Sequence, residues 1–187
     1  MTIGFAMCGS FCTFQNVFPA METLAENHTV IPIFSETAHN TDSRFGDADE
    51  HLLRATRICR TPPLHTIAQV EPIGPKKLLD ALIIAPCTGN TLAKLAHSIA
   101  DTPVTMATKS HLRNGRPVII AVSTNDALAG AAENIGKLLG KKHYYFVPFG
   151  QDDPINKPTS MVADFRKIPQ TLVLALDGKQ IQPMIFG

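Results

Sequence analysis

Short apolar segments alternate along the chain with longer stretches in which apolar residues recur every three or four positions. The first kind has the length and the β-branched composition of buried strands, and the second is typical of amphipathic helices. Strands are expected over residues 3–7, 30–34, 81–85, 118–122 and 144–147. Strands that alternate with helices favour a parallel sheet, because two consecutive parallel strands need a long crossover connection, which is usually a helix. The pattern therefore predicts an α/β fold in which helices cover both faces of a mainly parallel sheet.

The same spacing predicts where helices lie and where they end. Helical spacing marks residues 14–25, 52–58 and 128–139. Pro19 falls inside the first of these stretches, where its missing N–H predicts a kink or a late helix start. Two glycines are expected to end further helical segments: Gly115, shortly before the fourth strand, and Gly178, after an apolar segment near the C-terminus.

Proline-rich stretches and the chain length bound the domain organisation. Residues 61–75 carry four prolines and are expected to form a long ordered loop of the kind that often covers a site. Residues 148–158 are rich in Pro, Gly, Asp and Asn, which predicts a surface loop. A length of 187 residues suits one domain with a sizeable core. We expect a single domain over residues 1–187, with its core at 2–147 and a surface loop and C-terminal segment at 148–187.

Composition and charge exclude several classes of protein. The chain is 44% hydrophobic and 18% charged, which argues against wholesale disorder. Its 17 Lys and Arg residues balance 16 Asp and Glu residues and are scattered, so neither nucleic acid nor an anionic membrane is an expected partner. No apolar run approaches the roughly 20 residues that span a bilayer, and the N-terminus lacks the charged region of a signal peptide. The expected location is the cytoplasm.

The cysteines and histidines do not have the spacing of a metal site. Cys8 and Cys12 are four positions apart, but no second close pair completes a zinc set. Neither HxH nor HExxH occurs among the seven histidines. We therefore expect no metal, and we expect the four cysteines to be free thiols, as is usual in an unexported protein.

Small polar residues follow four of the predicted strands. Carboxyl ends of parallel strands meet at one edge of the sheet, so these residues are expected to converge where open α/β sheets bind ligands. Backbone N–H and hydroxyl donors, with glycines that let the backbone approach closely, suit a phosphate group. The candidate cofactor-binding residues are Gly9, Ser10, Ser35, Thr88, Gly89, Asn90, Thr91, Ser123 and Asn125.

The kind of ligand at this edge is narrowed by the motifs that the chain lacks. Neither the dinucleotide motif GxGxxG nor the triphosphate motif GxxxxGK[ST] is present. A mononucleotide such as FMN is therefore the natural candidate. The alternative is that Gly9 only relieves crowding and that the hydroxyl groups only cap helices.

Candidates for chemistry at this edge are few. Cys87 precedes a helix N-terminus, which can lower a thiol pKa, but small thiols commonly just fill space behind such turns. Lys94 lies one turn into that helix, where it either reaches an anionic ligand or is simply exposed. His65 and His97 are the histidines best placed for acid–base work, although a histidine in either place is more often just a surface or helix residue. No catalytic residue can be assigned from the sequence.

The stretch Pro86–Lys94, together with Ile99-Ala100-Asp101, resembles the family of homo-oligomeric flavin-containing decarboxylases. That family has Pro-Ala-Ser-Ala-Asn-Thr-Ile-Ala-Lys followed closely by Gly-Ile-Ala-Asp. The turn Gly9-Ser10 and Ser35 also look like its FMN contacts, and the resemblance covers roughly residues 2–147. It implies a three-layer sandwich with a flavodoxin-like or Rossmann-like sheet, a bound FMN and a homo-oligomer.

Within that family the chain is similar to the B subunits of dipicolinate synthases from spore-forming bacteria. The similarity runs along residues 4–14, 70–76, 157–164 and 177–183. It implies oxidation of a dihydrodipicolinate ring to pyridine-2,6-dicarboxylate with a separate A subunit, in the cytoplasm of the sporulating mother cell. The hydride acceptor would be FMN in the strand-end pocket, or NAD(P) held by the partner protein. Candidate cations for the small-molecule dicarboxylate are Lys76, Lys94, Lys109 and Arg113.

Two departures from the decarboxylase pattern bear on the activity. Cysteine decarboxylases of the family have a histidine about fourteen residues before the Pro-Ala-Ser motif, where this chain has Pro72. Their Pro-x-Met-Asn substrate clamp corresponds to Val122-Ser123-Thr124-Asn125, in which only Asn125 matches. Both departures argue against a flavin-dependent decarboxylase of a cysteine-derived substrate. That decarboxylase, and a non-catalytic subunit that organises its partner, are the alternatives to an oxidoreductase subunit.

Overall fold

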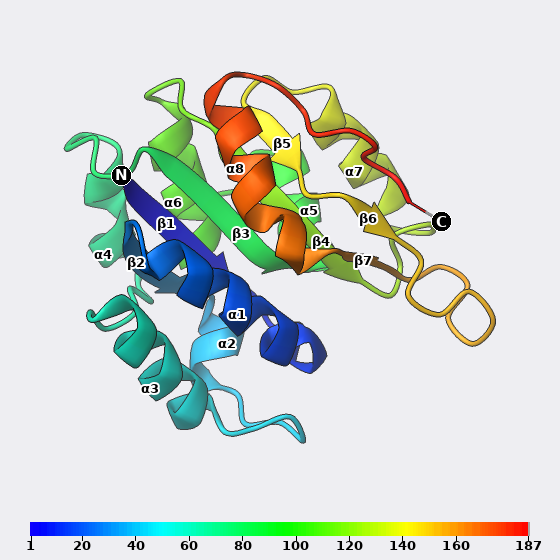
Figure 1. Ribbon diagram of the computed structural model, residues 1–187, viewed down its shortest axis with the longest axis horizontal. Helices are drawn as coiled ribbons and strands as arrows, with labels where there is room; N and C mark the ends of the chain where they lie inside the picture. Colours follow the sequence, from blue (N-terminus) through cyan, green and yellow to red (C-terminus); the bar gives the residue numbers. More distant parts are fainter. Residues whose placement is uncertain (187) are drawn as a thin grey trace.

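The computed structural model describes residues 1–186 and shows a seven-stranded sheet that is parallel at its centre (Figure 1). Its strands are β1 Thr2–Met7, β2 Thr29–Phe34, β3 Ala81–Cys87, β4 Val118–Thr124, β5 Tyr144–Phe146, β6 Phe149–Gly150 and β7 Met161–Ala163. The order is β2-β1-β3-β4-β7-β6, and β5 also pairs with β4. Pairings among β1 to β5 are parallel, whereas β7 runs antiparallel to β4 and to β6. The five strands expected from the apolar pattern are confirmed.

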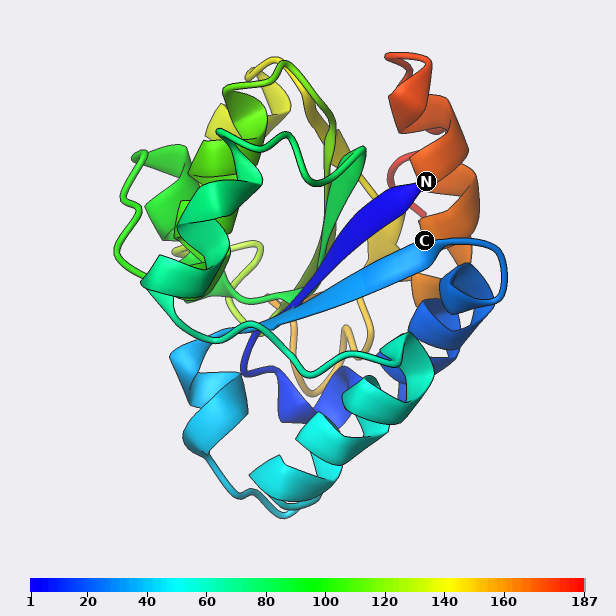
Figure 2. The same cartoon turned by 90° about the vertical axis from the view of Figure 1, so that its left-hand side faces the viewer.

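Helices cover both faces of the sheet, as Figure 2 shows. The α-helices are α1 Phe14–Ala25, α2 Glu36–Asn40, α3 Ala48–Cys59, α4 Ile67–Val70, α5 Gly89–Ala96, α6 Pro103–Leu112, α7 Ala132–Leu139 and α8 Ile168–Leu176. Short 3₁₀ helices lie at η1 Phe11–Thr13, η2 Glu71–Ile73 and η3 Phe165–Lys167. One layer holds α1, α3 and α8, and the other holds α4, α5, α6 and α7. This arrangement confirms the expected α/β sandwich with a flavodoxin-like sheet.

Two expectations about where helices and loops lie are corrected by the structure. Of the two outcomes expected at Pro19, the late helix start is wrong, because α1 begins at Phe14 directly after η1 and carries the proline in its interior. A kink at Pro19 stays a prediction. The buried face of α1, which includes Val17 and Met21, stabilises the helix despite the missing N–H. Residues 61–75 are not a plain loop, because α4 and η2 lie within them. Thr66 and Gln69 form a capping box at the start of α4.

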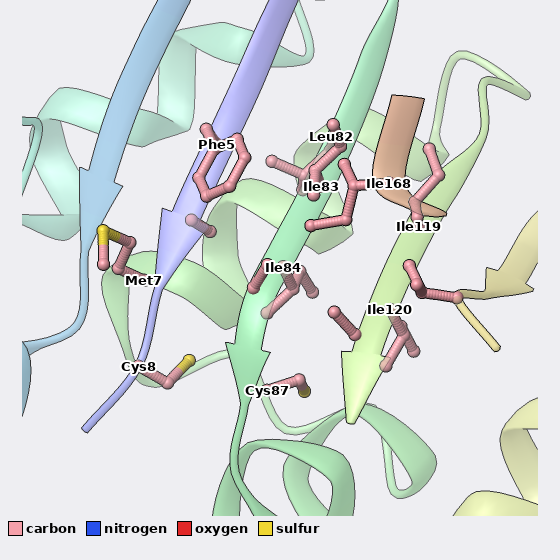
Figure 3. Packing of buried hydrophobic residues seen from close by; sticks show 14 of the residues in the cluster. Phe5, Met7, Cys8, Leu82, Ile83, Ile84, Cys87, Ile119, Ile120 and Ile168 are labelled. Atoms are coloured by element: carbon pink, nitrogen blue, oxygen red, sulfur yellow. The ribbon is translucent and has the colours of Figure 1, made fainter. Parts of the chain in front are cut away.

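The core lies on both faces of the central strands. Phe5, Ile83 and Ile120 on β1, β3 and β4 are fully buried, and every residue of β3 is buried (Figure 3). Ile168 at the start of α8 packs into the same cluster from one helical layer. A strand buried on both faces explains why the sequence at β3 is a continuous apolar run rather than an alternating one.

The C-terminal part of the chain returns to the sheet in a way that the sequence pattern did not predict. β7 pairs with the end of β4, with Ser123 opposite Val162 and Thr124 opposite Met161. Strands of two and three residues, such as β6 and β7, are too short to show a period. Their pairing holds the loop between them, residues 151–160, beside the carboxyl ends of the parallel strands.

Candidate functional site

A cleft of about 630 Å³ lies at the carboxyl ends of β1, β3 and β4. Three separate turns form its floor: the one after β1, the one after β3, and the one after β4. In a sheet of this order the chain crosses over in opposite directions from β1 and β3, and the loops that leave them separate to form a crevice. The cleft therefore lies where the fold favours ligand binding, within the 300–1,000 Å³ typical of small-molecule sites.

Five of the nine candidate residues line this cleft. They are Gly9, Ser10, Thr88, Ser123 and Asn125. The hydroxyl groups of Ser10 and Ser123 hydrogen-bond each other at 2.8 Å, which joins the turn after β1 to the end of β4. Turns that are 113 residues apart in sequence are thus brought together, as the parallel sheet predicts. Whether these residues contact a ligand stays a prediction.

Gly9 leaves no room for a side chain. A Cβ atom at this position would lie 2.8 Å from the Cγ2 atom of Thr37 on α2. The turn after β1 consequently packs directly against α2, and its backbone stays open towards the cleft.

The other four candidates hold the surrounding structure and are not among the cleft-lining residues. The Ser35 hydroxyl caps α2 by accepting a hydrogen bond from the N–H of Ala38 at 3.1 Å. Gly89 and Asn90 form the first turn of α5, and Thr91 points inward and donates to the Cys8 sulfur at 3.3 Å. A Cβ atom on Gly89 would lie 2.7 Å from the Asp126 carboxylate, so α5 begins against the turn after β4.

The buried thiols at the ends of β1 and β3 are not suited to nucleophilic attack. Figure 3 shows Cys8 and Cys87 side by side at these ends, inside the core. Burial raises the pKa of Cys8 to about 11, although hydrogen bonds to Thr91 and Thr88 oppose the rise. Burial likewise raises the pKa of Cys87, and the nearby Cys8 adds to this effect. Both thiols stay protonated at neutral pH, so Cys87 fills space behind the turn.

The remaining chemical candidates from the sequence lie away from the cleft. Lys94 forms an ion pair with Asp101 at 2.7 Å. His65 stacks on His39 in a separate hollow, with ring centroids 4.0 Å apart, and His97 is exposed at the end of α5. Among the described residues that line the cleft, none is a histidine.

The cations that were candidates for binding a dicarboxylate are also elsewhere. Lys109 and Arg113 line a different hollow of about 330 Å³, next to α6. Lys76 is exposed in the turn after η2. The cationic residues that line the cleft are instead Arg44 and Lys157. Both lie in surface loops, and no motif or spacing in the sequence marked them as binding residues.

Lys157 and Asp152 form the charged wall of the cleft on the side of β7. Their side chains are 3.3 Å apart. Burial alone would raise the pKa of Asp152, but hydrogen bonds from Ser160 and Lys157 outweigh it and hold the pKa below its usual value. The same loop is tied to the turn after β4, because the Thr159 hydroxyl donates to the carbonyl of Asn125 at 2.7 Å.

These residues fit a phosphate-bearing ring compound such as FMN. Hydroxyl groups come from Ser10, Thr88 and Ser123, although the Thr88 hydroxyl also caps α5 by accepting a hydrogen bond from the N–H of Thr91. The N–H groups of Gly89 and Asn90, in the first turn of α5, have no partner within the helix. Phe11 and Phe45 add apolar surface to the same cleft. Within residues 1–186, no three potential metal ligands lie together, and no helix has the length and apolar character needed to cross a membrane.

Comparison with known proteins gives consistent matches along the chain. The profile of the family described as Flavoprotein matches residues 1–164. The B subunit of dipicolinate synthase from Bacillus subtilis (strain 168) is 43% identical over 184 residues, which span 98% of this chain and 92% of that protein.

Solved structures are similar over nearly the same length. The crystal structure of the dipicolinate synthase B subunit from Bacillus halodurans C matches with a TM-score of 0.91 at 42% identity, covering 100% of this chain and 96% of that chain. The FMN-dependent cysteine decarboxylase SpaF matches with a TM-score of 0.68 at 21% identity, covering 94% of this chain and 97% of that one. The second likeness concerns the fold alone.

Proposed function

Because the chain belongs to the Flavoprotein family, we propose that it acts as the B subunit of a dipicolinate synthase. In this role it oxidises dihydrodipicolinate to dipicolinate, pyridine-2,6-dicarboxylate, together with an A subunit during sporulation. The observation that carries the proposal is the 43% identity to the B subunit of a dipicolinate synthase along 98% of the chain. The family resemblance expected from residues 86–94 is confirmed.

The proposed reaction removes two electrons and two protons from the dihydropyridine ring. Bound FMN would supply the acceptor for a hydride, which carries both electrons and one of the protons, and the second proton would leave to solvent. The hydroxyl groups of Ser10, Thr88 and Ser123 would bind its phosphate and ribityl chain, and Asn125 would face the substrate ring. Phe11 and Phe45 on the same cleft would limit the access of water to the reacting ring.

The partner completes the proposal in one of two ways. In the first, this chain carries the flavin and the A subunit completes the active site. In the second, NAD(P) is held by the A subunit, which performs the hydride transfer, while this chain binds the dicarboxylate. We place both proteins in the cytoplasm of the mother cell and propose that this chain forms a homo-oligomer.

The cleft supports ring oxidation better than decarboxylation of a cysteine-derived acid. Pro72, where the decarboxylases of the family have their histidine, lies in η2 and cannot exchange a proton. No histidine among the described residues lines the cleft. A decarboxylase of the expected type would therefore lack its acid–base group.

The proposal predicts that neither subunit alone gives the full rate of ring oxidation. The two subunits are purified separately and together, and dipicolinate formation is followed by absorbance with FMN and NAD(P)⁺ supplied in turn. We expect the chain to purify with yellow, fluorescent flavin and the pair to form dipicolinate. A colourless chain whose pair is active only with NAD(P)⁺ would assign the redox step to the partner. Full activity of the A subunit alone would contradict the proposal.

A further inference from the structure

Two cationic side chains line the cleft from loops that are far apart in sequence. Arg44 lies between α2 and α3, and Lys157 lies between β6 and β7. Figure 1 shows both loops projecting beyond the carboxyl ends of the parallel strands. The proposed function gives neither residue a role.

The turn that carries Arg44 is closed by its own hydrogen bonds. The backbone N–H groups of Ser43 and Gly46 each donate to the other residue's carbonyl at 3.1 Å, and the N–H of Phe45 donates to the Ser43 hydroxyl at 3.2 Å. Gly46 has a φ of 128°, in the region that favours glycine. The backbone around Arg44 is therefore held in one conformation.

This turn also rests on the buried side of α3. A Cβ atom on Gly46 would lie 2.9 Å from the ring of His51, which is buried and packs edge-on against Phe14 with centroids 4.8 Å apart. Directly after the turn, the N–H of Ala48 donates to the Asp42 carboxylate at 2.9 Å. Contact with the core on one side leaves Arg44 and Phe45 to face the cleft on the other.

The two cations differ in how far their charge is neutralised. Lys157 is paired with Asp152 in the same cleft wall. None of the ion pairs among residues 1–186 includes Arg44, whose guanidinium lies 4.8 Å from the centroid of the neighbouring Phe45 ring. Among the described residues, Arg44 is thus the cleft-lining cation that has no carboxylate partner, and an anionic ligand would be drawn to it.

We propose that Arg44 is a specificity-determining residue, which binds one carboxylate of a planar ring dicarboxylate, and that Lys157 contributes to binding the other. The inference rests on the proposed function for the identity of the ring. A guanidinium binds a carboxylate through two parallel hydrogen bonds, and its fixed plane orients the ring as well as attracting it. Phe45, beside Arg44, offers an aromatic surface for the ring.

Binding to the purified full chain tests this inference without requiring turnover. Pyridine-2,6-dicarboxylate is titrated calorimetrically into the wild type and into Arg44→Gln, Arg44→Lys and Lys157→Gln, each as purified and with added FMN. The matched control is Arg57→Gln, an exposed arginine on α3 outside the cleft. The uncharged pyridine-2,6-dicarboxamide serves as the ligand control, because it keeps the shape and removes both charges.

Arg44→Gln is expected to weaken dicarboxylate binding roughly 10- to 50-fold, as for the loss of a charged hydrogen-bonded pair. Arg44→Lys should recover part of this loss, Lys157→Gln should lose less than Arg44→Gln, and Arg57→Gln should stay within about twofold. Diamide affinity, flavin content and thermal unfolding should be the same in Arg44→Gln and wild type.

Three results would overturn the inference: dicarboxylate affinity of Arg44→Gln within about twofold of wild type, no binding by the wild type at millimolar ligand, or loss of flavin in place of dicarboxylate affinity. A ring-oxidation assay with the A subunit separates this inference from the proposed function. Binding that depends on Arg44 without any ring oxidation would refute the function alone. Ring oxidation with an unchanged KM in Arg44→Gln would refute the role of Arg44 alone.

Discussion

Between pH 6.5 and pH 4, the free energy of unfolding is expected to fall by about 3 kcal/mol less in His111→Gln than in the wild type. His111 lies on α6 and is fully buried. Its Nε2 atom hydrogen-bonds the carbonyl of Pro117 at 3.1 Å, just before β4, and its Nδ1 atom has no hydrogen-bond partner within residues 1–186. A glutamine amide can still donate to that carbonyl, but it does not titrate.

The direction of the effect follows from the two pKa values of this histidine. Burial lowers the pKa of His111 from 6.5 to about 4 in the folded protein; the bond to Pro117 opposes this, and the charge of Arg116 adds to it. Between these values the unfolded chain binds a proton that the folded protein does not. The free energy of unfolding therefore falls as the pH drops from 6.5 to 4. Above pH 6.5 the imidazole is neutral in both states, so the stability that this histidine costs at low pH is fully retained.

Urea unfolding of the wild type and of His111→Gln at several pH values between 7 and 4 measures this difference. The wild type should lose more stability than the variant over that range, whatever the variant loses at pH 7 through imperfect packing. His97→Gln, at an exposed position, should follow the wild-type curve. Parallel curves for wild type and His111→Gln would show that the buried imidazole does not control acid stability.

The parts of the fold that sequence patterns predict are those that depend on many residues at once. β3 is a run of seven buried residues and α1 has a regular apolar face, so the sequence pattern is enough to predict both elements. β7 has three residues and depends on pairing with β4, which no local pattern encodes. Tertiary contacts likewise decide that α1 continues through Pro19.

The candidate site shows the same division. Convergence of Ser10, Thr88 and Ser123 follows from parallel topology, because strand ends must share an edge. The inward turn of Thr91 towards Cys8 depends on side-chain packing that spacing does not determine. Arg44 was missed because a lone arginine in a polar loop resembles any surface residue, and its position over the cleft comes from the fold. Its only local sign is the glycine that closes the turn, Gly46.

Substituting Gly74 with alanine is expected to destabilise the protein by about 3 kcal/mol, at the upper end of the usual cost of overpacking. Gly74 follows η2 and is buried against α6. An added Cβ atom would lie 2.5 Å from the carbonyl oxygen of Ser110 and 3.1 Å from its carbonyl carbon. These are helix backbone atoms, which cannot rotate away as a side chain would. The segment would have to move off α6, straining the 3.1 Å hydrogen bond from the Asn114 amide to the Gly74 carbonyl.

Gly136→Ala adds the same methyl group in the interior of α7, where no atom of the described residues would lie within 4 Å of it. Alanine is the better helix former, so this variant should gain up to about 1 kcal/mol. Urea unfolding of both variants at pH 7 compares one chemical change in two surroundings. If the free energy of unfolding falls in Gly74→Ala and rises in Gly136→Ala, the close approach of η2 and α6 requires glycine at position 74. The conformational entropy of the unfolded chain would then not be the reason, because it changes in the same way in both variants. A Gly74→Ala variant as stable as the wild type would mean that this contact is looser than the structure shows.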